Sequence, residues 1–253
     1  VNGQSQRATT LEFDLSGLLM RSDNLIYDHQ TDTLWNAMTG TPASGALAES
    51  GIQLQQLPMV VSDWGSWLKL HPETSVLSLF TGYQRKYQVG AAYGDYFNNP
   101  DQLMFPIWQQ DTAILPNKQT VFTLSLNNTP KAYPLDVLLR EVVTNDEIGG
   151  EGVVLIMYAN ARREFLEPGE AAVRAYQRGG HTFGKGETRA AVIDETGVVW
   201  TMTEEALIAP DGTQLARLPG HLSYWFAWYA FYPQTEIYRG GEAATGDFDI
   251  ETG

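Results

Sequence analysis

The chain has 253 residues, of which 43% are hydrophobic and 18% charged, and this excludes a chain that is disordered throughout. Against 16 Lys and Arg residues stand 30 Asp and Glu residues, giving a formal net charge of -14. We therefore expect no binding to nucleic acid, whose phosphates require cationic side chains. The absence of Cys excludes disulfides and thiolate metal sites within this sequence. No apolar run approaches the roughly 20 residues of a transmembrane helix.

The chain opens on strand patterns, Thr10–Leu19 and Asn24–Tyr27, and a polar turn then leads into Thr33–Trp35. A helix of about ten residues follows. Its predicted N-cap is Ser62, and Trp64 and Trp67 recur at helical spacing. The helix is expected to end before Pro72, because the residue preceding a proline resists the helical conformation.

Residues 80–118 are rich in Tyr, Gly, Asn and Pro, and we interpret them as a connector that carries function or packs as its own loop. A hairpin is predicted next, with Asn127–Asn128 as its turn, and a helix that begins after Pro134. Further strands are predicted at Val153–Tyr158, Arg163–Leu166, Val173–Tyr176, Ala190–Ile193 and Glu204–Ile208. A second helix with two Trp residues follows Ser223 and ends before Pro233.

Two parts of the sequence resemble each other. Residues 57–77 align with 218–238 without gaps, pairing two Trp and two Pro residues, and YDHQTDTLW (27–35) parallels VIDETGVVW (192–200). We therefore predict an α+β fold of mostly antiparallel β-sheet with short helices, arranged as two related repeats. The predicted divisions are 1–79, the C-terminal part of the first repeat; 80–118, the connector; 119–239, the second repeat; and 240–253, an acidic flexible tail.

Several motifs resemble the uncharacterised family named domain of unknown function 3179. They include SGLLMRSDNLIYDHQTDTLW (16–35), KAYPL (131–135) and TNDEIGG (144–150), and the resemblance runs from about residue 11 to 238. It implies an exported protein built from two related halves, with no established activity to transfer. Typical members also carry a Tyr-Cys-Pro-Leu-Cys motif in their first half, so we expect this sequence to lack that motif and most of the first repeat. Arg21 stands where the family usually has Asn, and His29 where it has Arg.

The polar turn and the connector offer candidate ligand-binding residues, because Tyr and Arg together suit a small polar or sugar-like ligand. Two alternatives stay open: Asp28 caps its own turn, and the connector packs through its own aromatic residues. The candidates are Arg21, Asn24, Asp28, His29, Tyr83, Arg85 and Tyr87, and the connector also carries Tyr93 and Tyr96.

The helix within 224–232 carries aromatic residues on every face, which predicts either a core helix or an interface with another protein or a membrane surface. The interface candidates are Trp225, Phe226, Trp228, Tyr229, Phe231 and Tyr232, with the acidic tail as a second contact. The four His residues lack metal-ligand spacing, and no nucleophile or nucleotide motif is present. We therefore predict no metal and no cofactor, and the catalytic residues are unknown.

The sequence favours an extracytoplasmic (periplasmic or secreted) binding or structural module without catalytic machinery of its own. One alternative is that the chain is part of an extracytoplasmic oxidoreductase or hydrolase whose reactive residues lie in the missing first half. Another is an accessory subunit of a larger assembly, docked through the aromatic helix. Whether the protein is an enzyme is left open.

Overall fold

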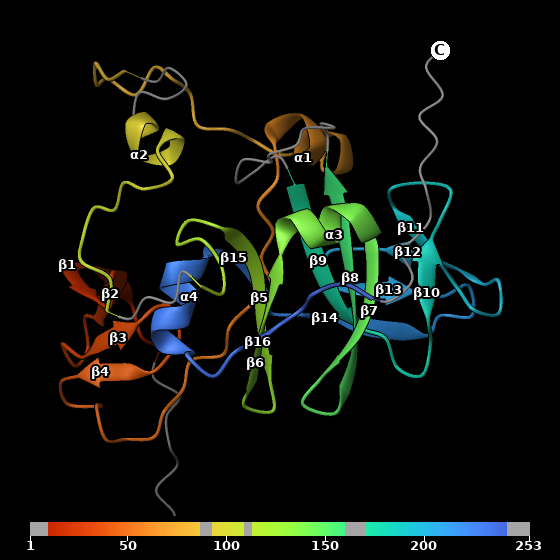
Figure 1. Cartoon of the computed structure of the whole chain (residues 1–253). Helices are drawn as coiled ribbons and strands as arrows, with labels where there is room; N and C mark the ends of the chain where they lie inside the picture. The colour runs from red at the N-terminus through yellow and green to blue at the C-terminus, as the bar shows by residue number, and fades with distance from the viewer. Residues whose placement is uncertain (1–9, 87–92, 109–112, 160–170, 242–253) are drawn as a thin grey trace, which may run out of the picture.

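Antiparallel strands dominate the computed structural model, which describes residues 10–86, 93–108, 113–159 and 171–241 (Figure 1). The strands are β1 Phe13–Met20, β2 Asp23–Asp28, β3 Leu34–Asn36, β4 Pro42–Ser44, β5 Thr120–Leu126, β6 Thr129–Pro134, β7 Val143–Ile148, β8 Glu151–Ala159, β9 Ala171–Gln177, β10 Phe183–Lys185, β11 Ala191–Asp194, β12 Val199–Met202, β13 Ala206–Ile208, β14 Gln214–Leu218, β15 His221–Tyr224 and β16 Glu236–Ile237. The helices are α1 Trp64–Leu70, α2 Gly94–Asn98, α3 Leu135–Glu141 and α4 Trp225–Phe231.

The centre of the molecule is the strand pair β8–β9, which buries both of its faces. Along β8, Val153 and Leu155 pack on β5, β6 and α3, whereas Val154 and Ile156 pack toward Trp200 and Leu207 on the other side. A strand alternates its side chains between two faces, so burial of both faces requires a continuous apolar run. This explains the VVLIM segment at 153–157.

The eight-stranded sheet that contains β8 and β9 has the order β10-β11-β12-β13-β14-β9-β8-β7 and curls until its edge strands meet. Asn145 on β7 closes the gap: its side-chain amide donates to the Phe183 carbonyl at 2.7 Å and accepts from the Phe183 N–H at 2.8 Å. One side chain therefore replaces a pair of backbone bonds between two edges that would otherwise be unpaired. We call this curled sheet the barrel.

A second layer consists of β15, β5, β6 and β16, of which only β16 pairs in parallel. Its hairpin turn, Asn127–Asn128, has both residues in the left-handed region, as a tight two-residue turn requires. One face of β5 and β6 packs on the barrel. Helix α4 lies beside β5 and β15 (Figure 1). On the other face, Trp225 and Trp228 of α4 are buried against Val121 and Ala132.

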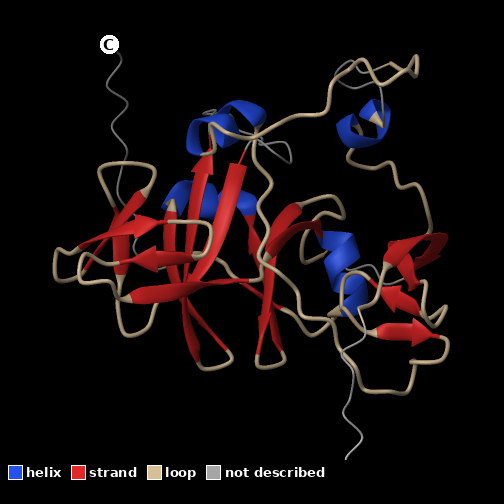
Figure 2. Ribbon diagram, turned by 180° about the vertical axis from the view of Figure 1, so that it is seen from behind, coloured by secondary structure: helices blue, strands red, loops and turns tan. Residues whose placement is uncertain are grey.

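The N-terminal sheet, β1-β2-β3-β4, lies on the far side of α4 from the barrel (Figures 1 and 2). It has little core of its own: among the described residues, Leu25 and Trp35 are the buried apolar side chains that precede Val121. By contrast, most of the exposed large apolar side chains of the described residues belong to this N-terminal region, between Phe13 and Trp108. The exceptions are Val198 and Val199. The stretch 45–119 contains α1 and α2 and, in its described part, no strand.

Two hairpin turns, one in the N-terminal sheet and one in the barrel, are each stabilised by the same kind of hydrogen bond, from a Trp indole to an Asp carboxylate. In the N-terminal sheet, Asp28 accepts from the indole N–H of Trp35 at 2.8 Å, and in the barrel Asp194 accepts from that of Trp200 at 2.9 Å. Each carboxylate also accepts from the backbone N–H and hydroxyl of a Thr in its own turn. Both turns are therefore held by a buried carboxylate that satisfies a buried indole.

The sequence-based elements are confirmed for most strands and for both Trp-bearing helices, with corrections at the caps. The N-cap of α1 is Asp63, whose carboxylate accepts from the Ser66 N–H at 2.8 Å. The N-cap of α4 is Tyr224, whose side chain makes no capping hydrogen bond. The prediction of Ser62 and Ser223 as N-caps was therefore wrong by one residue. Each helix spans seven residues rather than ten and ends just before the proline. The predicted strand Arg163–Leu166 lies outside the described residues.

Barrel closure by Asn145 gives the first prediction. In Asn145→Ala, two hydrogen bonds between β7 and β10 are lost, and we expect the free energy of unfolding to fall by about 1–3 kcal/mol in guanidinium titrations. The matched control is Asn98→Ala, which removes an exposed amide from α2. Equal stability of the two variants would show that the edge strands do not need this bridge.

Candidate functional site

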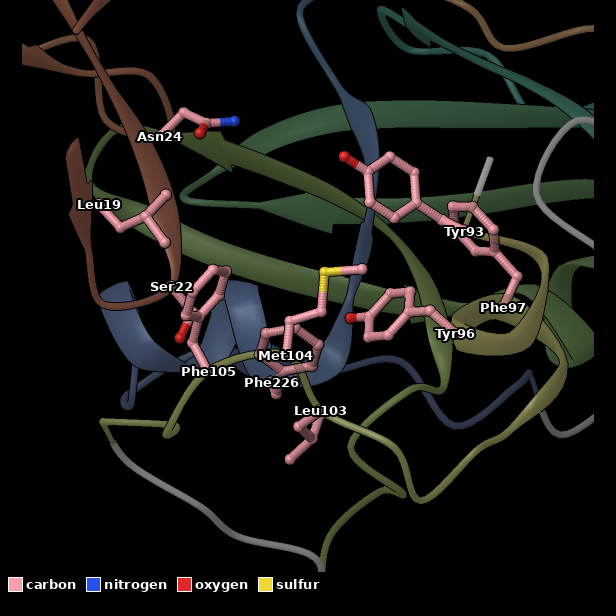
Figure 3. Close-up of a pocket in the computed structure, with 10 residues that line it drawn as sticks. All are labelled: Leu19, Ser22, Asn24, Tyr93, Tyr96, Phe97, Leu103, Met104, Phe105 and Phe226. Carbon is pink, nitrogen blue, oxygen red and sulfur yellow. The ribbon is translucent and has the colours of Figure 1, made fainter. Parts of the chain in front are cut away.

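A cavity of about 380 Å³ opens between the N-terminal sheet, the connector and α4 (Figure 3). The β1–β2 hairpin supplies one wall, α2 the opposite wall, and residues 103–105 a third side. In Figure 3 the amide of Asn24 and the hydroxyls of Tyr93 and Tyr96 point toward the space between these walls. The lining residues are Leu19, Ser22, Asn24, Tyr93, Tyr96, Phe97, Leu103, Met104, Phe105 and Phe226.

The hairpin wall is fixed by its turn. Arg21 and Ser22 both have positive φ, 53° and 66°, which gives the tight turn that two-residue hairpins favour. The Ser22 hydroxyl donates to the carbonyl of Pro106 at 3.0 Å, and a guanidinium N–H of Arg21 donates to the carbonyl of Ala230 at 2.8 Å. The turn thereby ties the hairpin to both the connector and α4.

Arg21 also lies over two aromatic rings. Its guanidinium carbon is 5.4 Å from the ring centre of Phe231 and 5.8 Å from that of Trp108. Guanidinium groups are attracted to the negative face of aromatic rings. These contacts and the bond to α4 offset the cost of a left-handed backbone at a residue with a long side chain.

The opposite wall is held by Lys118, which precedes β5. Its ammonium group donates to the carbonyls of Tyr96 and Asn99 and lies 3.5 Å from the ring centre of Tyr96. Burial lowers the pKa of Lys118 and raises the pKa of Tyr96. The ring of Tyr96 in turn contacts that of Tyr224 edge-on, at 6.5 Å between centres. Helix α2 is thus fastened to the start of α4.

The chemistry of the cavity is apolar with uncharged polar groups. Among the residues that the structure describes, its lining includes no Asp, Glu, Lys, Arg or His, and its polar side-chain atoms come from Ser22, Asn24, Tyr93 and Tyr96. Several lining side chains, among them Phe97, Met104 and Phe105, are about half exposed to solvent. Such a cavity suits an uncharged, largely apolar or aromatic group that could hydrogen-bond to an amide and to hydroxyls.

Of the predicted ligand-binding residues, Asn24 lines the cavity and Arg21 borders it through its backbone turn and its contacts with α4. Tyr83 and Arg85 contact each other, at 5.9 Å, and do not line it. His29 is exposed and lies 3.9 Å from Asp14. Tyr87 lies outside the described residues.

Asp28 has the structural role that the sequence analysis weighed as an alternative. Its side chain is fully buried and serves Trp35 and Thr31. Burial by itself would raise its pKa, but the hydrogen bonds from Trp35 and Thr31 outweigh burial and hold the pKa below the usual value. Asp28 therefore stabilises its own turn and does not line this cavity.

The aromatic helix α4 is a core element. Trp225, Phe226 and Trp228 are 1%, 8% and 2% exposed and pack within this chain, while Tyr229, Phe231 and Tyr232 are partly buried. Side chains that already fill the core are not available to a partner, so the interface predicted for Trp225, Phe226 and Trp228 is corrected. The interface predicted for Tyr229, Phe231 and Tyr232 stays a prediction. The acidic tail beyond Gly241 lies outside the described residues.

Much of the lining was not singled out by the sequence. Tyr93 and Tyr96 stood out as connector aromatics, but Leu19, Met104 and Phe105 carry no motif. Within the described ranges, no group of three or more His, Asp and Glu side chains is placed to hold a metal ion, and no helix there is long and apolar enough to cross a membrane.

Comparison with known proteins gives one match. The family model described as "Protein of unknown function (DUF3179)" matches residues 3–235. No curated protein and no solved structure matches the chain.

The carboxylate of Asp28 gives the second prediction. Because its pKa is lowered in the folded chain, its contribution to stability is present above its unfolded pKa, about 3.9, and is lost as the pH falls through the folded value. We expect Asp28→Asn to destabilise the chain most at neutral pH, with the difference from the unchanged protein shrinking below about pH 4. Chemical unfolding across pH measures this, with exposed Asp14→Asn as control. A difference independent of pH would contradict the carboxylate role.

Proposed function

We propose a binding role for this chain, which belongs to the family of proteins of unknown function DUF3179. The observation that carries the proposal is the cavity between the N-terminal sheet, the connector and α4, with its uncharged and largely apolar lining. We propose that it receives an uncharged apolar or aromatic group, which Asn24 and Ser22 orient by hydrogen bonding. This proposal replaces the expectation of a small polar or sugar-like ligand.

The free energy of binding would come from covering apolar lining side chains that are partly exposed to solvent in the free protein. Leu19 is 40% exposed, Met104 45% and Phe105 52%. Covering apolar surface yields about 25 cal/mol per Å². The walls are fixed by Arg21, Ser22 and Lys118, so little additional ordering opposes binding.

A second candidate function is docking to a partner protein. It is supported by the concentration of exposed large apolar side chains on residues 57–80, which include Leu57, Leu77 and Phe80 at 76%, 83% and 96% exposure. Apolar surface gathered in one region often marks an interaction surface. We propose this region as a docking element of an accessory subunit, in addition to the partly exposed rings of the aromatic helix.

The extracytoplasmic location, and the alternative of an enzyme whose reactive groups lie elsewhere, remain proposals that rest on the sequence alone. We also propose that the two halves arose as related repeats. Matched contacts support this: the indole N–H of Trp67 donates to Thr74 at 3.0 Å and that of Trp228 to Thr235 at 2.9 Å. The ring four residues further on, at the C-cap of each helix, also lies close to the indole: His71 is 4.0 Å from Trp67 and Tyr232 is 4.1 Å from Trp228, between ring centres.

The cavity gives the third prediction, tested with Nile red as an uncharged apolar probe whose fluorescence rises in apolar surroundings. In Leu19→Lys and Met104→Lys, an ammonium group enters the lining without a partner. We expect the affinity for the dye to fall at least about tenfold, because a bound apolar dye would displace water from the new ammonium group and offer it no hydrogen bond.

The matched control is Leu77→Lys, which places the same charge on an exposed leucine outside the cavity. We expect this variant to bind the dye as the unchanged protein does. If Leu77→Lys weakened binding as much as Leu19→Lys, the dye would report the exposed apolar surface and the cavity would lose its support.

A further inference from the structure

A second, larger cavity lies where α1 faces one rim of the barrel. It measures about 610 Å³ and is lined by residues 62–70 on one side and by the ends of β8, β9 and β12 on the other. A smaller cavity of about 260 Å³ shares Leu70, Arg174 and Met202 with it. The mouths of β-barrels are frequent ligand sites.

The segment that carries α1 is tied to this rim. A guanidinium N–H of Arg217 on β14 donates to the carbonyl of Met59 at 3.0 Å. His71, just after α1, lies with Nε2 3.6 Å from a carboxylate oxygen of Glu204. The cavity between the helix and the barrel is therefore bounded by contacts on both sides of α1.

The rim holds an excess of buried positive charge. Glu204 lies between Arg174 and Arg217, and both guanidinium groups hydrogen-bond to its carboxylate. Both arginine side chains are only 4% exposed. Burial by itself would raise the pKa of Glu204, but the two arginines outweigh burial and hold the pKa below its usual value. Among the described residues, one carboxylate thus serves two cations.

The two arginines have hydrogen-bonding capacity left over. Glu204 binds Nε and Nη2 of Arg174, which leaves Nη1 outside this pair. Within the described residues, the buried Nε of Arg217 and Nε2 of His71 have no hydrogen-bond partner. Buried donors without acceptors are costly, so an acceptor arriving from outside would find favourable sites.

The described lining of the larger cavity also carries more positive than negative side chains, although the formal net charge of the chain is -14. Lys69 and Arg189 join Arg174 around the larger cavity, against Asp63 as the acidic member of the lining. Leu70, Met202 and the ring of Tyr158 add apolar surface beside these charges. Cations next to apolar surface match an anion that carries an organic body.

We propose that this cavity binds a small organic acid, with its carboxylate at Arg174, supported by Arg189 and Lys69, and its apolar body against Leu70, Tyr158 and Met202. Guanidinium groups pair with carboxylates through two parallel N–H bonds, which an uncharged analogue cannot reproduce. The site is independent of the apolar cavity beside α4, so either could fail without the other.

In the test, the full chain is titrated with benzoate and with its uncharged analogue benzamide. Binding is measured by calorimetry and by the NMR signal of the Met202 methyl group. We expect benzoate to shift the Met202 signal saturably and benzamide to bind at least about tenfold more weakly. Arg174→Lys keeps a cation beside Glu204 but loses the planar fork, and we expect about a tenfold loss of benzoate affinity. Arg189→Gln, at the cavity wall, gives a second measure if the buried variant fails to fold.

The matched control is Arg140→Gln, which removes a positive charge from an exposed site on α3, where Arg140 pairs with Asp136. It should leave benzoate binding unchanged. The proposal is overturned if Met202 shows no saturable shift, if benzamide binds as well as benzoate, or if Arg140→Gln weakens binding as much as Arg189→Gln. Competition by inorganic phosphate as strong as that by benzoate would overturn the organic-acid assignment.

Discussion

The packing of α4 against β5 and β6 is the constraint on which the rest of the structure depends. Trp225 and Trp228 are buried against Val121 and Ala132, and the indole of Trp228 is satisfied by Thr235. The rest of the helix is then presented to the N-terminal half. Its Phe226 lines the apolar cavity and its Ala230 carbonyl receives Arg21. The helix thus packs into the core beside β5 and β6 and also provides the surface that the N-terminal sheet and the connector contact.

This arrangement produces a marked asymmetry between the halves. The barrel, β5 and β6 bury both faces of β8 and β9 and contain most of the buried apolar side chains. The N-terminal half keeps its position through individual ties such as Ser22 to Pro106 and Lys118 to the Tyr96 and Asn99 carbonyls. A region held by such ties, with apolar side chains left exposed, is suited to binding because a ligand adds the missing burial.

Local features could be predicted from the sequence. The two Trp-bearing helices follow from the spacing of their indoles and the closing prolines, and the turns at Asp28 and Asp194 follow from short polar segments before a Trp. The N-caps were misplaced because neighbouring polar residues compete for that role, and Asp63 accepts the bond from Ser66 that Ser62 was expected to accept.

Features that join distant segments could not be predicted. The edge strands of the barrel meet because Asn145 bonds to Phe183, 38 residues further along, and nothing in either segment indicates the other. The same holds for the apolar cavity, where Leu19, Met104 and Phe226 come together from three parts of the chain. The cationic rim depends in the same way on Arg174, Glu204 and Arg217. In each case tertiary packing, rather than local pattern, creates the site.

The most direct test of the central claim is methyl NMR of the methionines during titration with an uncharged aromatic compound such as naphthalene. The chain has six methionines, of which Met104 lines the apolar cavity, Met157 is buried in the core and Met59 is exposed outside the cavity. The account predicts a saturable shift of the Met104 signal while those of Met157 and Met59 stay in place. A saturable shift of Met59 with Met104 unchanged would contradict it.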